Sequence, residues 1–90
     1  MKLIKTLTIV NKLGLHARAA TKLVQLANSY KCEVMLEQGG QQAPANSVLA
    51  LLMLESSQGK QVTLICDGID AQIAMENIEH LIANKFDEGE

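Results

Sequence analysis

Apolar and polar residues alternate with a period of two in three stretches of the sequence, which cover residues 3–10, 32–37 and 60–67. This alternation predicts β-strands with one apolar face and one polar face. The pair Gly39-Gly40 follows the second of these stretches and is a strong hairpin signal. We therefore expect a short returning strand over residues 41–43, which ends at Pro44.

Apolar residues recur with a helical period over residues 16–29 and 71–82, and the almost wholly apolar run over residues 48–54 is expected to form a short helix between them. The first apolar stripe contains Ala17, Ala20, Leu23, Val24 and Ala27. The last contains Ala71, Ala74, Met75, Ile78, Leu81 and Ile82. Asn46 and Ser47 are both suitable N-caps for the short second helix, and Asp70 is suitable for the third.

The predicted order is β-α-β-β-α-β-α. One apolar face per strand and one apolar stripe per helix predict an α+β fold of two layers, with helices on one face of an antiparallel sheet. A chain of 90 residues suits one domain over residues 1–90, in which the acidic tail, residues 86–90, is expected to fray. Because Tyr30 and Phe86 are the only aromatic residues, aliphatic side chains and methionine must fill the core.

Charge and composition exclude several functional classes. The net charge of −2 and the absence of a basic stripe argue against nucleic-acid binding. No apolar run approaches the ~20 residues of a membrane span, and the N-terminus lacks the pattern of a signal peptide. Cys32 and Cys66 occupy alternating strand positions, so we expect small core side chains rather than a disulfide or metal ligands. The sequence indicates a cytoplasmic protein without a cofactor.

The candidate chemistry lies in the segment Gly14-Leu15-His16-Ala17-Arg18, between the first strand and the first helix. Helix N-termini present unpaired N–H groups and partial positive charge, which suit an anion. The imidazole of His16 can accept a phosphoryl group through a ring nitrogen, and the guanidinium of Arg18 can stabilise its charge. Gly14 permits a positive φ in the loop before them.

A plainer interpretation is that His16 only caps the helix. The sequence contains no magnesium ligand set and no nucleotide-binding loop. If His16 does carry a phosphoryl group, we therefore expect the donor to be another phosphoprotein rather than ATP. His80, in the last predicted helix, is expected to be a surface residue.

Two segments resemble the HPr family of histidine-containing phosphocarrier proteins: Gly14-Leu15-His16-Ala17-Arg18-Ala19-Ala20, and the run over residues 45–54. The second segment and the acidic tail look most like the nitrogen-related (NPr) branch. The resemblance implies a four-stranded antiparallel sheet with three helices on one face, an open-faced sandwich. It also implies that an enzyme I-type protein, charged from phosphoenolpyruvate, phosphorylates His16 on Nδ1, and that His16 passes the group to an enzyme IIA-type acceptor.

The resemblance also assigns roles around His16. Arg18 matches the family's phosphate-contacting arginine, and Ser47 matches a serine that a kinase modifies in some members, although an N-cap role alone also explains it. The residues expected to contact partners are Ala17, Thr21, Lys22, Gln25, Leu49 and Leu52. The chain departs from the family signature at Ala19, where the family usually has proline. Proline would pre-set φ in the first helical turn, whereas alanine returns an N–H to the site.

Three functions remain open from the sequence. The first is a monomeric phosphocarrier of the nitrogen-type relay, a stoichiometric intermediate rather than an enzyme with its own small-molecule substrate. The second is a regulatory binding module whose phosphorylation state switches its partner. The third is a metabolite-binding α+β domain with a pocket at a dimer interface, for which His16 and Arg18 would be coincidental. The sequence does not choose between nitrogen-type and sugar-type partners beyond the resemblance.

Overall fold

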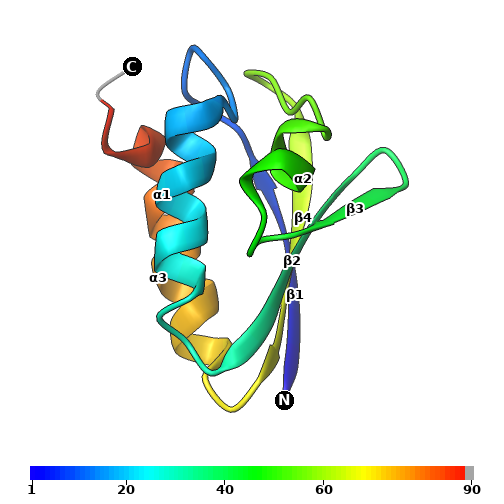
Figure 1. The fold of residues 1–90 in the computed structure, drawn as a ribbon, viewed down its shortest axis with the longest axis vertical. Coiled ribbons are helices and arrows are strands. Elements are labelled where there is room, and N and C mark those ends of the chain that lie inside the picture. Colours follow the sequence, from blue (N-terminus) through cyan, green and yellow to red (C-terminus); the bar gives the residue numbers. More distant parts are fainter. Residues whose placement is uncertain (89–90) are drawn as a thin grey trace.

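The computed structural model describes residues 1–88 and confirms the predicted order of elements (Figure 1). The elements are β1 (Lys2–Thr8), α1 (Ala17–Ala27), β2 (Cys32–Gln38), β3 (Gln41–Pro44), α2 (Val48–Leu52), β4 (Gln61–Gly68), α3 (Ala71–Ala83) and the 3-10 helix η1 (Lys85–Asp87). Most bounds differ from the predicted ones by one or two residues. The helix α2 ends two residues earlier than predicted, at Leu52.

The four strands form one antiparallel sheet in the order β1-β4-β2-β3. The predicted hairpin joins β2 to β3, with Gln38 paired to Gln41. Gly39 and Gly40 have φ values of 58° and 83°, and two successive positive φ values suit the right-handed twist of a hairpin. The helices cover one face of this sheet, as predicted, and α1 packs against α3 (Figure 1).

The core lies between the helices and the sheet. All six residues predicted for the apolar stripe of α3 are buried. Cys66 is a buried free thiol, and burial together with the nearby Cys32 raises its pKa to about 11, so it is a core side chain as expected. Within residues 1–88, no helix has both the length and the apolar character needed to cross a membrane.

The C-terminal segment differs from its prediction. The expectation that residues 86–90 fray is wrong for residues 86–88, because Phe86 has no exposed surface and lies in η1. Burial of an aromatic ring is strongly favourable and anchors the segment. Its two last residues, 89–90, lie outside the described part of the chain.

Asp70 precedes α3 as predicted, but its side chain does not cap the helix. Its carboxylate instead accepts a hydrogen bond of 2.7 Å from the backbone N–H of Lys31. This contact joins the turn before α3 to the turn before β2. From its sequence position Asp70 could either cap α3 or bind another segment, and in the folded protein its carboxylate binds the backbone of Lys31.

Candidate functional site

The loop before α1 is held rigidly by contacts with a distant part of the chain. Gly14 has a φ of 67°, so the loop uses the positive φ that glycine permits. The N–H of Leu15 donates to the carbonyl of Ser56 at 2.8 Å. Asn11 is fully buried, and its Nδ2 donates to the carbonyl of Gly14 at 2.7 Å. These contacts fix where His16 enters the helix.

We expect Gly14→Ala to destabilise the fold strongly. A Cβ at this position would lie 2.6 Å from the carbonyl oxygen of Ser56 and 2.9 Å from the Cα of Ser57. The left-handed φ adds its own penalty, so we expect a loss of more than about 2 kcal/mol of unfolding free energy. Denaturant unfolding measures this loss.

Gly59→Ala is the matched control, because Gly59 also has a positive φ of 89° but its Cβ would meet no atom within 4 Å. Gly59→Ala should lose only the unfolding free energy that corresponds to the left-handed φ, without the part that comes from a steric clash. Equal losses for the two variants would show that Ser56 and Ser57 do not confine the loop.

His16 is the N-cap of α1, and its ring is half-buried. Its Nδ1 accepts a hydrogen bond from the backbone N–H of Ala19 at 3.4 Å. Its Nε2 is buried and has no hydrogen-bond partner within the described residues. The helix-capping interpretation and the location at an anion-attracting helix end therefore both hold for His16. Of the two ring nitrogens, Nδ1 is the one directed at the helix N-terminus.

The structure places Arg18 in an ion pair that the sequence did not predict. Its side chain is 74% exposed, and Nη1 donates to Oε1 of Glu88 at 3.2 Å. The Nζ of Lys22 donates to Oε2 of Glu88 at 2.7 Å and to the carbonyl of Phe86 at 2.9 Å. The hydrogen bond from Lys22, together with the charges of Lys22 and Arg18, lowers the pKa of Glu88. The C-terminal segment thus lies beside the first turns of α1 (Figure 1).

An open cavity of about 480 Å³ lies at this position and is lined by Leu13, His16, Ala17, Arg18 and Glu88. The exposed first turn of a helix and two cationic side chains favour an anion here, and the carboxylate of Glu88 already satisfies the two cations. Sequence reasoning missed Glu88. The signal that could have found it is Phe86, since an apolar aromatic side chain near a chain end indicates a docked segment.

The short helix α2 presents an apolar surface to solvent. Leu49 is 70% exposed and Met53 is 68% exposed, whereas Leu52 is half-buried and packs against the core. Of the two leucines predicted to contact a partner, Leu49 is therefore the more accessible. Ser47 is the N-cap of α2, and its Oγ accepts a hydrogen bond of 3.1 Å from the N–H of Ala50. The helix packs against α1 and β3.

The remaining predicted partner residues lie along α1. Ala17, Thr21 and Gln25 are exposed, and Oγ1 of Thr21 donates to the carbonyl of Ala17 at 2.8 Å. Lys22 is half-buried by its contacts with the C-terminal segment. The structure thus places Ala17 and Arg18 beside His16, while Thr21, Lys22 and Gln25 lie further along the same helix.

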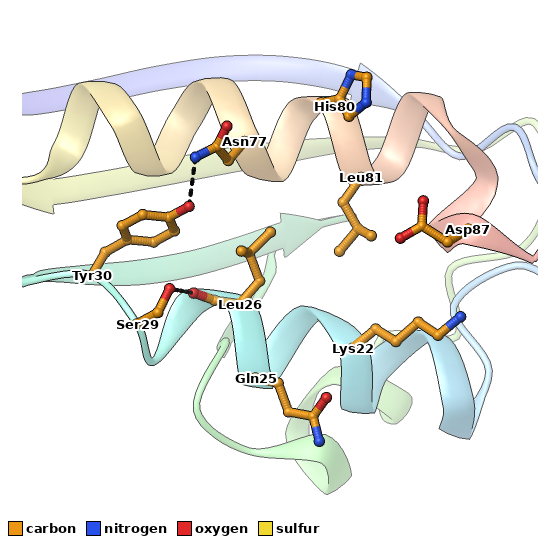
Figure 2. A pocket seen from close by; sticks show the side chains of 9 residues that line it. All are labelled: Lys22, Gln25, Leu26, Ser29, Tyr30, Asn77, His80, Leu81 and Asp87. Carbon is orange, nitrogen blue, oxygen red and sulfur yellow. Dashed lines mark hydrogen bonds between the residues drawn. The ribbon is translucent and has the colours of Figure 1, made fainter.

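Lys22 and Gln25 also line a groove of about 630 Å³ between α1 and α3 (Figure 2). The hydroxyl of Tyr30, at one end of the groove, and Nδ2 of Asn77 form a hydrogen bond of 2.6 Å. His80 lines the groove and is exposed, as predicted. His16 does not line it, so the larger hollow is separate from the candidate phosphoryl site.

Comparisons with known proteins identify the family. Residues 3–84 match the family model described as "PTS HPr component phosphorylation site". The chain is 53% identical over 87 residues to phosphocarrier protein NPr of Shewanella violacea, which covers 97% of this chain and 96% of that protein. The chain belongs to the HPr family of phosphocarrier proteins. The family predicted from the two sequence motifs is therefore confirmed.

Other HPr proteins support the same assignment. Phosphocarrier protein HPr of Cupriavidus necator is 49% identical, over 92% of this chain and 93% of that protein. The crystal structure of HPr-C-His from Thermoanaerobacter tengcongensis superposes with a TM-score of 0.91 at 35% identity, over 96% of this chain and 97% of that chain. The HPr fold, a four-stranded antiparallel sheet with three helices, is thus the fold of this chain.

Proposed function

We propose that this HPr-family chain carries a phosphoryl group on Nδ1 of His16 in the nitrogen-related branch of the phosphotransferase system. An enzyme I-type protein is the donor and an enzyme IIA-type protein is the acceptor. The observation that carries the proposal is the position of His16, whose Nδ1 faces the N-terminus of α1. The metabolite-binding alternative would need no nucleophile at a helix end, whereas a regulatory module switched by phosphorylation would need the same His16.

The two ring nitrogens differ in a way that supports the choice of Nδ1. Nε2 is buried, so a phosphoryl group of several atoms has no room there without movement of the ring. Nδ1 lies where the helix end favours negative charge, and Arg18 lies in the same helical turn. Phosphoryl transfer relies mainly on positioning and on stabilisation of charge, and these groups supply both.

The charge carried by the phosphoryl group also gives Arg18 and Lys22 a role. Both side chains bind the carboxylate of Glu88 in the unphosphorylated chain. A phosphoryl group carries more negative charge than a carboxylate and offers three oxygens. We therefore expect Arg18, the more exposed of the two, to turn from Glu88 to the phosphoryl group, while Lys22 keeps Glu88 in place.

The assignment to the nitrogen branch rests on the relative from Shewanella violacea, which is named NPr. A relative named HPr is only slightly less identical, so the choice of donor is the point to test. The experiment incubates the purified protein with phosphoenolpyruvate and either a nitrogen-type or a sugar-type enzyme I. Acid-labile phosphate is then measured over time. We expect faster uptake from the nitrogen-type donor.

Faster uptake from the sugar-type enzyme I would overturn the branch but not the carrier function. Absence of acid-labile phosphate with both donors would overturn the carrier function itself. Modification of Ser47 stays a prediction from the resemblance, and the same samples can be checked for acid-stable phosphate after incubation with a serine kinase and ATP.

We expect Leu49→Glu to weaken docking of the donor without unfolding the protein. Leu49 is 70% exposed, so its replacement should change the unfolding free energy by no more than about 0.5 kcal/mol. A charge at the centre of an apolar contact is costly, and we expect a fall of about tenfold or more in kcat/KM for the donor reaction. Initial rates at several carrier concentrations measure this change.

Ile69→Glu is the matched control, since Ile69 is 87% exposed and lies in the turn between β4 and α3. This variant should be phosphorylated at the wild-type rate. If Leu49→Glu unfolds the protein, Leu49 stabilises the fold rather than the complex. If both variants react like wild type, α2 is not part of the docking surface.

A further inference from the structure

The backbone N–H of Ala19 is a group that the usual family signature does not provide. Proline, which the signature usually has at this position, has no N–H, whereas Ala19 donates to Nδ1 of His16 at 3.4 Å. We infer that this N–H takes part in phosphoryl transfer: it orients Nδ1 before the transfer and binds a phosphoryl oxygen after it. The inference rests on the proposed function of His16.

Before transfer, the hydrogen bond selects the reactive form of the ring. In a neutral imidazole one nitrogen carries the proton and the other accepts. Because Nδ1 accepts from Ala19, the proton is on Nε2 and the lone pair of Nδ1 is available. Nε2 makes no hydrogen bond within residues 1–88, so the bond from Ala19 is the one hydrogen bond that orients the ring in the described structure.

During transfer, the lone pair of Nδ1 that accepts from Ala19 is the pair that forms the new bond to phosphorus. The bond between phosphorus and the phosphohistidine nitrogen of the donor breaks, and its electron pair returns to that nitrogen. The proton on Nε2 stays on the ring in this step. The N–H of Ala19 must therefore release Nδ1 at the moment when the phosphoryl group arrives.

After transfer, the phosphoryl oxygens replace Nδ1 as the nearest acceptors at the end of α1. The Ala19 side chain is fully buried, so the core fixes the backbone and the imidazole is the part that turns. A hydrogen bond to a charged oxygen is roughly twice as strong as one between neutral groups. The N–H thus stabilises the phosphorylated state more than the unphosphorylated one.

The test compares Ala19→Pro, which removes the N–H, with Ala19→Gly, which keeps it and removes only the buried methyl group. Proline is tolerated in the first turn of a helix, so we expect Ala19→Pro to fold with a melting temperature near that of wild type. From the difference between a charged and a neutral hydrogen bond, we expect its equilibrium constant for phosphorylation by the donor to fall about fivefold. Ala19→Gly keeps the N–H, so its equilibrium constant should fall less than that of Ala19→Pro.

Two NMR readouts report the N–H directly. The ¹⁵N shifts of the unphosphorylated ring should show the proton on Nε2 in wild type and Ala19→Gly, and a mixture of tautomers in Ala19→Pro. In wild type, the Ala19 amide should exchange with solvent more slowly after phosphorylation. This second readout needs no variant, so it decides the matter even if Ala19→Pro fails to fold.

Unchanged equilibrium constants in Ala19→Pro, or faster exchange of the Ala19 amide in the phosphorylated protein, would overturn the inference. These results are distinguishable from failure of the proposed function. If wild type accepts phosphate on His16 but the Ala19 readouts do not change, only the inference fails. If wild type accepts no phosphate at all, the proposed function fails first.

Discussion

We expect His16→Ala to abolish the uptake of acid-labile phosphate while the protein remains folded. No other described side chain places a ring nitrogen at the N-terminus of α1. The variant loses only a long capping hydrogen bond of 3.4 Å, so the cost in unfolding free energy should not exceed about 1 kcal/mol. Labelling from phosphoenolpyruvate through the donor, together with thermal melts, measures both quantities.

His16→Asn separates capping from chemistry. Asparagine is a good N-cap but cannot form a phosphohistidine. This variant should therefore be as stable as wild type and take up as little acid-labile phosphate as His16→Ala. His80→Ala should keep full uptake, because His80 is exposed on α3 and lines the separate groove. Wild-type labelling of His16→Ala, or label on His80, would contradict the assignment of the site.

The second large effect is expected at Arg18. Its side chain is 74% exposed and its ion pair with Glu88 lies at the surface, so Arg18→Ala should cost less than about 1 kcal/mol of stability. A charge-assisted contact with phosphate is stronger, and its loss should lower the transfer rate by about ten- to a hundredfold. Single-turnover kinetics with the phosphorylated donor measure this rate.

Arg18→Lys should recover only part of the rate, because a point charge replaces a guanidinium that can make two parallel hydrogen bonds. Lys31→Ala is the control for loss of an exposed positive charge, since Lys31 lies beyond the opposite end of α1. It should transfer at the wild-type rate. Equal rates for Arg18→Ala and wild type would show that Arg18 does not contact the phosphoryl group.

The contact between Arg18 and Glu88 has a further consequence for these measurements. In the unphosphorylated chain a carboxylate already neutralises part of the positive charge at the site. If Arg18 contacts the phosphoryl group as proposed, the measured effect of Arg18→Ala is a difference, because Glu88 competes for the same guanidinium. A glutamate carboxyl is already ionised at physiological pH, and the hydrogen bond from Lys22 lowers the pKa of Glu88 further, so this competition is present there.

The sequence by itself determined the elements and singled out His16, the side chain proposed to react. Periodicity reports local geometry, so the buried stripe of α3 and the turn at Gly39-Gly40 were both predictable. The position of His16 between a strand and a helix was enough to predict a capped, anion-attracting helix end. Each of these features depends on residues only a few positions apart.

Tertiary structure alone decided the features that join distant residues. The ion pair between Arg18 and Glu88 spans 70 positions, and the contact between Lys31 and Asp70 spans 39. Periodicity carries no information about such pairs, because either partner would satisfy the same local pattern with solvent. Burial of Phe86 decides where the last residues of the described chain lie, and that burial exists only once α1 and α3 have packed together. The core thus places Glu88, and through it Arg18, beside His16.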